Sequence, residues 1–220
     1  MGSQKRCLIV TGGTVDLEFA ASYIGKRHYE FVIAVDKGLI ACHKLGCNVD
    51  YILGDFDSVD PSILEIYKDK KGSYEIKTLN PEKDMTDTED AIMVALEHGV
   101  TEIELIGATG TRIDHMLANI NLLMKPLKNC VKACILDKNN RIYVKNDNFT
   151  ISKEEVLGTY ISFLPLTSEV TGVTLSGFKY PLHDYTLTIG NSLGVSNEII
   201  QEEATVTVGQ GVLIVIESRD

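Results

Sequence analysis

The chain has no tryptophan and no long hydrophobic run. Nothing in it approaches the roughly 18 consecutive apolar residues that a membrane-spanning helix requires, so no membrane span is expected. The residues before Cys7 include no separate hydrophobic region of the kind that marks a secretory signal. We therefore expect a cytoplasmic protein with no membrane partner.

Positive charge is also in short supply. Lysine and arginine total 21 against 31 aspartates and glutamates, so the formal net charge is −10. A surface of this sign repels nucleic acid, and no run of about five like charges supplies a local basic patch. The charge balance excludes nucleic acid as an expected partner and favours a cationic or cation-bound small molecule.

The cysteines do not have the spacing of a zinc site. They are odd in number and scattered through apolar stretches, at Cys7, Cys42, Cys47, Cys130 and Cys134. Neither of the two closer pairs has the two-residue gap of a zinc knuckle. We expect core residues in a reducing compartment and no structural zinc.

Strand-like and helix-like segments alternate in the first part of the chain. The predicted strands are 7–10, 31–35, 51–53, 74–78, 102–106 and 131–136, and the predicted helices are 17–24, 39–45, 61–67, 86–98 and 113–124. Regular alternation of this kind implies a mostly parallel sheet covered by helices on both faces. The sequence therefore predicts a Rossmann-like α/β domain over residues 1–138.

After residue 138 the helical periodicity fades. Short β-branched segments separated by turn residues take over, at 141–144, 159–164, 170–175, 185–189, 205–208 and 212–216. Glycine or asparagine in several of the gaps suits antiparallel strands and their turns. Residues 139–220 are thus expected to form a smaller all-β sandwich domain.

Two carboxylates follow the third predicted strand. Its apolar run stops at Gly54 and is followed by Asp55 and Asp57. On an extended backbone, this spacing points both side chains the same way, where they can hold a hard cation such as Mg²⁺. A polar turn is the alternative, because Asp and Ser are common turn residues. The position at a strand end in an open parallel sheet favours the metal site.

Other polar clusters follow the first, second and fifth predicted strands or precede a predicted helix. Because the carboxyl ends of parallel strands lie at one edge of the sheet, these clusters can converge there. Thr11-Gly12-Gly13-Thr14 can turn backbone N–H groups and a helix dipole toward a phosphate, although the motif is weak on its own. Asp36-Lys37-Gly38 follows the second strand. At 83–89, Asp87 and Glu89 either cap the next helix or serve a metal or ligand. Residues 107–115 join a glycine-rich loop to Arg112, Asp114 and His115.

The order of these motifs resembles that of the thiamine pyrophosphokinase family. The motifs are Gly-Asp-Phe-Asp-Ser at 54–58, Lys-Asp-Met-Thr-Asp-Thr-Glu at 83–89 and Gly-Ala-Thr-Gly-Thr-Arg-Ile-Asp-His at 107–115. In the second half, Leu-Ser-Gly-Phe-Lys-Tyr-Pro-Leu at 175–182 and Asn-Ser-Leu-Gly-Val-Ser-Asn-Glu at 191–198 are similar to the thiamine-binding segments of its bacterial members. The resemblance covers essentially the whole chain.

This resemblance implies transfer of a pyrophosphoryl group from ATP to the hydroxyl of thiamine, with release of AMP. It implies a nucleotide-binding α/β domain, a thiamine-binding sandwich and a homodimer whose active sites are each completed by the partner's second domain. Asp55, Asp57 and Asp87 would hold Mg²⁺, with Arg112 and Asp114 beside the phosphates. With the clusters above, the expected nucleotide-binding residues are Gly12, Gly13, Asp36, Lys37, Lys83, Asp84, Thr86, Gly107, Thr109, Gly110 and His115. The expected thiamine-binding residues are Tyr180, where eukaryotic relatives carry a stacking Trp, and Ser192, Ser196 and Asn197.

Some points stay open at this level. The family commonly has Gly where this chain has Lys37, so that side chain must point away or add a phosphate contact, and Thr111 replaces a Gly before Arg112. Asp114 or Asp87 can accept the proton of the thiamine hydroxyl. Two rival functions are a phosphatase with Asp55 as nucleophile and a catalytically silent nucleotide or thiamine sensor.

Overall fold

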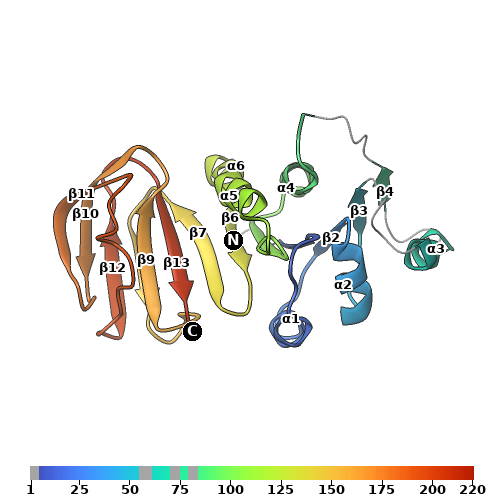
Figure 1. Cartoon of the computed structure of the whole chain (residues 1–220), viewed down its shortest axis with the longest axis horizontal. Helices are drawn as coiled ribbons and strands as arrows, with labels where there is room; N and C mark the ends of the chain where they lie inside the picture. The colour runs from blue at the N-terminus through green and yellow to red at the C-terminus, as the bar shows by residue number, and fades with distance from the viewer. Residues whose placement is uncertain (1–4, 55–60, 70–74, 79–83) are drawn as a thin grey trace. The chain divides into compact units, whose positions relative to one another are not determined.

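The structure is a computed structural model that describes residues 5–54, 61–69, 75–78 and 84–220. The chain divides into two compact units, Met1–Lys138 and Asn139–Asp220, which Figure 1 shows in ribbon form. In the described part of the chain, no helix is long and apolar enough to cross a membrane.

The first unit contains a parallel sheet with the strand order β4-β3-β2-β1-β5-β6. Its strands are β1 (Arg6–Val10), β2 (Phe31–Val35), β3 (Tyr51–Gly54), β4 (Glu75–Thr78), β5 (Glu102–Ile106) and β6 (Lys132–Leu136). Helices α1 (Leu17–Ile24), α2 (Gly38–Leu45) and α3 (Pro61–Asp69) lie on one face, and α4 (Asp87–Glu97), α5 (Ile113–Leu122) and α6 (Met124–Lys128) lie on the other (Figure 1). The predicted α/β fold with helices on both faces is confirmed.

The strand order places a topological switch beside β1. The chain builds outward from β1 through β2, β3 and β4, and then returns to add β5 on the other side of β1, where Val10 pairs with Ile106. The connections after these two neighbouring strands run to opposite faces, which leaves a crevice at their carboxyl ends. Residues Cys7–Val10 are fully buried because helices cover both faces of a parallel strand.

The second unit is all antiparallel β. Its strands are β7 (Asn140–Lys145), β8 (Phe149–Ser152), β9 (Tyr160–Pro165), β10 (Glu169–Ser176), β11 (Leu182–Thr188), β12 (Glu203–Thr207) and β13 (Leu213–Ser218). Strands β7, β13 and β9 pair with one another, and a second sheet has the order β11-β10-β12-β8. Buried side chains of both sheets form one core, in which the rings of Phe163 and Phe178 meet edge to face at 5.4 Å. The expected sandwich is confirmed.

The structure departs from the sequence-based expectations at three places. Cys130 is exposed and is not a core residue. Strand β8 was missed because only Phe149 and Ile151 carry its alternating pattern, and its pairing with β12 comes from a distant segment. The helix predicted over 113–124 is shorter, and a separate short helix α6 contains Pro126. Proline is tolerated there because it is the third residue of the helix, where its missing N–H would have no partner within the helix.

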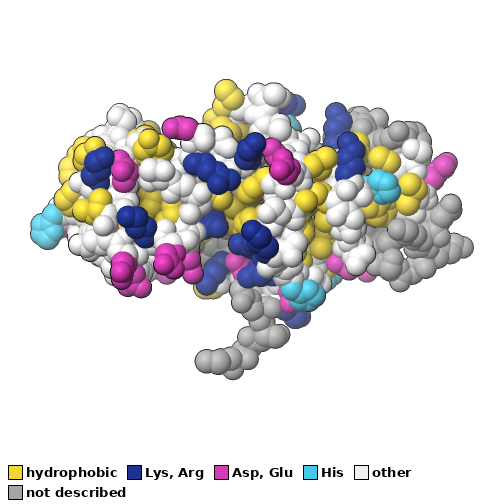
Figure 2. Space-filling view, turned by 90° about the horizontal axis from the view of Figure 1, so that it is seen from below, with side chains coloured by type: hydrophobic (Ala, Val, Ile, Leu, Met, Phe, Trp, Pro, Cys, Tyr) yellow, Lys and Arg dark blue, Asp and Glu magenta, His cyan; other side chains and the backbone are white. Residues whose placement is uncertain are grey.

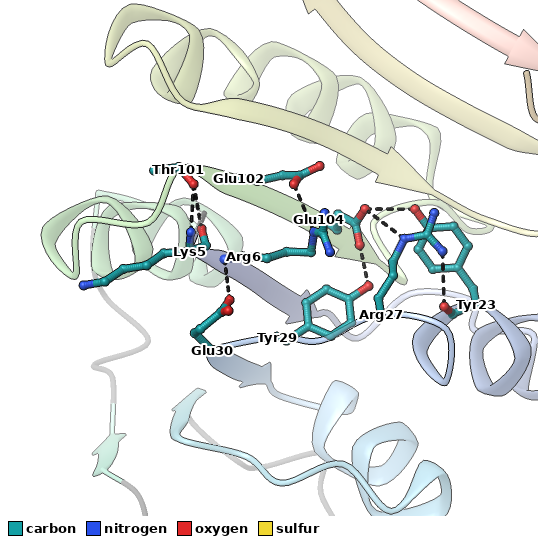
Figure 3. Close-up of polar contacts among 9 residues, drawn as sticks. All are labelled: Lys5, Arg6, Tyr23, Arg27, Tyr29, Glu30, Thr101, Glu102 and Glu104. Atoms are coloured by element: carbon teal, nitrogen blue, oxygen red, sulfur yellow. Dashed lines mark hydrogen bonds and ion pairs between the residues drawn. The ribbon is translucent and has the colours of Figure 1, made fainter. Parts of the chain in front are cut away.

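A buried carboxylate holds α1 against the sheet (Figure 3). Glu104 on β5 is 3% exposed and accepts hydrogen bonds from the hydroxyls of Tyr23, at 2.9 Å, and Tyr29. The Arg27 guanidinium lies 3.6 Å from the same carboxylate and stacks over the Tyr23 ring. Burial and the nearby negative charge raise the pKa of Tyr29, which keeps its hydroxyl a donor. This cluster supplies the buried charge with partners.

Candidate active site

A cavity of about 750 Å³ lies in the first unit, where the connections after β1, β2 and β5 meet the starts of α4 and α5. Its walls are residues 11–14, 35–37, 85–88 and 107–112, together with His115, Met116 and Asn119. It therefore occupies the crevice that the strand order creates. Of the residues predicted to bind nucleotide or metal, Gly12, Gly13, Asp36, Lys37, Thr86, Asp87, Gly107, Thr109, Gly110, Arg112 and His115 line it.

The two glycine-rich loops of the cavity are hydrogen-bonded to each other. Gly13 N–H donates to the Gly107 carbonyl and Thr14 N–H to the Thr109 carbonyl, both at 2.9 Å. The expectation that these N–H groups face a phosphate is therefore wrong for Gly13 and Thr14, because the second loop consumes them. The pairing instead gives the cavity a rigid wall between β1 and β5.

The start of α1 is satisfied by the chain itself. Asp16 is the N-cap, and its carboxylate accepts the Phe19 N–H at 2.9 Å. This hydrogen bond lowers the pKa of Asp16 and keeps the cap ionised. The positive end of the α1 dipole is thus already paired with a carboxylate, contrary to the expected role in attracting a phosphate.

The adjacent glycines Gly12 and Gly13 differ in whether there is room for a side chain. A Cβ on Gly13 would lie 2.1 Å from the Gly107 carbonyl oxygen, whereas a Cβ on Gly12 would lie no closer than 3.5 Å to any neighbour. We expect Gly13→Ala to force the loops apart and lower the free energy of unfolding by about 1–3 kcal/mol. Gly12→Ala is the matched control and should change it little. Equal losses in urea unfolding of the two variants would contradict the loop pairing.

Asp36, which follows β2, lies next to Gly54 at the end of β3. Asp36 adopts a left-handed backbone conformation with φ 47, and its N–H donates to the Leu53 carbonyl at 2.9 Å. A Cβ on Gly54 would lie 2.1 Å from Asp36 Oδ1, so glycine is required there. Asp55 and Asp57 follow Gly54 directly, but they lie outside the described residues, as does Lys83. Their roles stay predictions.

The acidic residues near the start of α4 have different surroundings. Thr86 caps the helix by accepting the Glu89 N–H at 3.2 Å, and the Glu89 carboxylate pairs with Lys125 at 2.9 Å. Asp87 lines the cavity, whereas Asp84 is exposed and is not among the described lining residues. Thr86 therefore caps α4 through the Glu89 N–H, and Asp87 is the carboxylate that this segment contributes to the cavity.

Arg112 and Asp114 form an exposed, two-pronged pair at the start of α5. Arg112 Nε lies 3.2 Å from Asp114 Oδ1, and Nη2 lies 2.6 Å from Oδ2. The hydrogen bond from Arg112 lowers the pKa of Asp114 to about 2. A carboxyl group that holds its proton this weakly is a poor general base near neutral pH.

This pair makes a pH prediction. Because the pKa of Asp114 is lowered, the ion pair is complete above the ordinary aspartate range and is lost as pH falls through about 2. Carbon-13 NMR of the Asp114 carboxyl should therefore show no protonation until pH approaches that value. In Arg112→Gln the midpoint should rise toward the ordinary aspartate pKa of about 3.9. An identical midpoint in both proteins would mean that the pair does not exist in solution.

Sequence reasoning missed Asn119. It is buried on α5, lines the cavity and donates from Nδ2 to the Ala108 carbonyl at 2.8 Å, which fixes the second loop. The available signal was its place four residues after His115, on the same side of a helix. Met116, on the same helix, also lines the cavity and lay outside the predicted motifs.

The predicted thiamine residues lie in the second unit, on two segments that pair with each other. Lys179 N–H donates to the Glu198 carbonyl at 2.9 Å, which joins residues 178–181 to 191–198. Tyr180, Ser192 and Ser196 are exposed, whereas Asn197 is buried. A tyrosine ring and hydroxyl groups are thus available to a ligand on this surface.

The described residues of the cavity provide some, but not all, of the oxygen ligands that a Mg²⁺ ion needs. Asp36 and Asp87 both line it and offer the carboxylate oxygens that Mg²⁺ prefers. Within the described ranges, no group of three or more His, Cys, Asp or Glu side chains could hold a metal ion. The described residues therefore fit such an ion provided that further ligands come from elsewhere, as the prediction for Asp55 and Asp57 requires.

Comparison with known proteins gives a consistent match. Residues 25–135 match the family profile described as thiamin pyrophosphokinase, catalytic domain, and residues 148–213 match thiamin pyrophosphokinase, vitamin B1 binding domain. The chain is 38% identical to thiamine pyrophosphokinase of Bacillus subtilis (strain 168), over 86% of this chain and 87% of that protein.

Solved structures show the same similarity. The crystal structure of thiamine pyrophosphokinase from Bacillus subtilis superposes with a TM-score of 0.87 at 33% identity, over 98% of this chain and all of that chain (100%). The crystal structure of thiamin pyrophosphokinase from Geobacillus thermodenitrificans gives a TM-score of 0.83 at 31% identity, over 98% of each chain.

Proposed function

Because the chain belongs to the thiamine pyrophosphokinase family, which transfers a pyrophosphoryl group from ATP to thiamine, we propose that the cavity of the first unit binds ATP and hosts this transfer. The observation that carries the proposal is the convergence of three predicted motifs on one cavity. Lys37, Asp87 and Arg112 come from separate connections and all line it. Phosphoryl-type transfer depends mainly on positioning and on charge neutralisation, which such a constellation supplies.

The proposed roles follow from charge. Lys37 and Arg112 bind the phosphate oxygens of ATP as cations. Asp87, together with Asp55 and Asp57, would hold Mg²⁺, and Asp36 offers a further carboxylate on the wall. When bound, Mg²⁺ neutralises negative charge on the phosphates. Lys83 and Asp84 complete the proposed nucleotide site, and the paired glycine-rich loops form its wall.

Of the two carboxylates considered as the general base, Asp114 is the less suitable. Asp114 is paired with Arg112 and its pKa is about 2, so it orients the guanidinium toward the phosphates better than it accepts a proton.

We further propose a homodimer in which the second unit of one subunit supplies the thiamine site of the other. Exposed apolar side chains support an interface. Ile113 and Leu117 on α5 are 66% and 54% exposed and flank the cavity residues Arg112 and His115. In the second unit, Ile189, Leu193 and Val195 are exposed beside Ser192 and Ser196. Surfaces of this kind commonly mark association sites. Light scattering should give twice the mass of one chain, and a monomeric mass would remove the shared site.

The net charge of −10 disfavours nucleic acid as a partner. On the face shown in Figure 2, Lys and Arg side chains are interspersed with acidic and hydrophobic ones.

The deciding experiment is to incubate the protein with ATP, Mg²⁺ and thiamine and to identify the nucleotide product. AMP together with thiamine pyrophosphate supports the proposal. Inorganic phosphate formed without thiamine would point to the phosphatase, and binding without any AMP would point to the silent sensor. Formation of ADP would contradict pyrophosphoryl transfer.

Lys37 gives a separate test of the nucleotide site. It is exposed at the start of α2 and lines the cavity, so we expect Lys37→Ala to raise the KM for ATP about tenfold, the size of one charged contact. The KM for thiamine should stay constant. Lys44→Ala, at the far end of the same helix, is the control for charge alone. Equal effects of the two variants would show that Lys37 points away from ATP.

A further inference from the structure

Asn197 lies beside Ser192 and Ser196 in sequence, yet its side chain faces inward. It is 3% exposed. Its Oδ1 accepts the Tyr180 N–H at 3.0 Å, and its Nδ2 donates to the Tyr180 carbonyl at 2.8 Å. The amide thus pairs with both backbone groups of one residue, as a neighbouring β-strand would.

The backbone of Asn197 is fixed separately to β9. Asn197 and Ile161 exchange two backbone hydrogen bonds, at 2.9 and 2.8 Å, and Ile161 is fully buried. The preceding Ser196 has a left-handed backbone with φ 58, and its N–H donates to Ser162 Oγ at 3.1 Å. The side chain of Asn197, which lies in the connection between β11 and β12 and is anchored to β9, therefore reaches Tyr180 in the connection between β10 and β11.

The side chain of Asn197 has few hydrogen-bonding positions left for a ligand. Its Oδ1 accepts a second hydrogen bond, from the Glu198 N–H at 2.9 Å, so both acceptor positions of the oxygen are used. Burial removes the remaining N–H from easy reach of a solute. Tyr180 is the opposite case, because its side chain is 57% exposed while its backbone is held by the Asn197 amide.

We propose that Asn197 is a positioning residue for thiamine, which places the Tyr180 ring through its backbone and does not touch the substrate. The inference rests on the proposed role of Tyr180 as the platform for the thiamine cation. A platform whose backbone is already fixed loses less conformational freedom when the ligand binds. Loosening the backbone should therefore weaken thiamine binding without affecting ATP.

A double-mutant cycle tests this. Asn197→Ala is expected to raise the KM for thiamine about tenfold and to leave the KM for ATP unchanged, with Tyr180→Ala raising the KM for thiamine at least as much. In the double variant, the KM for thiamine should equal that of Tyr180→Ala, because Asn197 acts only through that ring. Multiplied effects would show that Asn197 contacts thiamine independently and would overturn the inference.

The control is Asn148→Ala. Asn148 Oδ1 accepts the Val208 N–H at 2.9 Å in the same unit, away from both thiamine segments, so its loss should reduce thermal stability without changing the KM for thiamine. If Asn197→Ala behaves like this control, its role is only structural and the inference fails. If Asn197→Ala does not fold, Asn197→Asp, which keeps the acceptor and loses the donor, takes its place in the cycle.

Wild-type AMP formation is measured before the cycle. If thiamine-dependent AMP does not form, the proposed function fails and the inference with it. If AMP forms and Tyr180→Ala leaves the KM for thiamine unchanged, or the effects multiply, the proposed reaction stands and the positioning role of Asn197 alone is rejected.

Discussion

Replacing Asp87 by Asn is expected to lower kcat for thiamine pyrophosphate formation by roughly 100- to 1000-fold, the loss found when one charge-stabilising group is removed from an active site. Asp87 lines the cavity at the first residue of α4 and is a carboxylate proposed to hold Mg²⁺. The amide keeps the shape of the side chain but neither its charge nor its basicity. Steady-state assays of AMP release measure the effect.

The fold should survive this change. Thr86 still caps α4, and loss of one acidic residue in the first helical turn costs about 0.3–1 kcal/mol. Glu97→Gln makes the same carboxylate-to-amide change at the other end of the helix and should leave kcat unaltered. We expect Asp55→Asn and Asp57→Asn to match Asp87→Asn in kcat. Wild-type turnover in Asp87→Asn would remove this residue from the catalytic site.

Glu104→Ala is expected to lower the free energy of unfolding by about 3 kcal/mol, the largest stability effect that we predict. The substitution leaves the half-buried Arg27 and the half-buried hydroxyls of Tyr23 and Tyr29 without their common, buried carboxylate (Figure 3). Buried donors that lose their acceptor forfeit the hydrogen bond and are not rehydrated. Urea unfolding followed by circular dichroism measures the change.

Two variants on the same strand separate charge from burial. Glu104→Gln keeps an acceptor oxygen and should lose less than Glu104→Ala. Glu102→Gln removes the partner of Arg6 at 2.9 Å, but this pair is partly solvated, so less than about 1 kcal/mol is expected. If Glu102→Gln and Glu104→Ala destabilise equally, the buried cluster does not hold α1 to the sheet.

The fold was largely accessible from sequence. Strands such as Phe31–Val35 and Glu102–Ile106 and helix Leu17–Ile24 were found with the bounds that the structure gives, because their apolar runs and caps are local signals. Strand β8 was not found, since a short strand without a strong alternating pattern is defined by its partner β12.

For the site, the sequence identified most of the residues that line the cavity, but not the contacts that they make. The motifs identified Lys37, Asp87 and Arg112, and the position of each after a strand or before a helix predicted that they would meet at one sheet edge. Asn119 was missed, because its contact with Ala108 depends on how α5 packs against the loop after β5.

The sequence by itself therefore determined the two-part architecture and the motifs that meet at the cavity, since periodicity, turn residues and strand ends are properties of neighbouring residues. Only the tertiary structure decided which polar groups are free to act. The N–H groups of Gly13 and Thr14 are consumed by a loop that lies far along the chain, and the Asn197 amide is consumed by Tyr180. A donor or acceptor forms a limited number of hydrogen bonds, and its partners are known only when distant segments have been brought together.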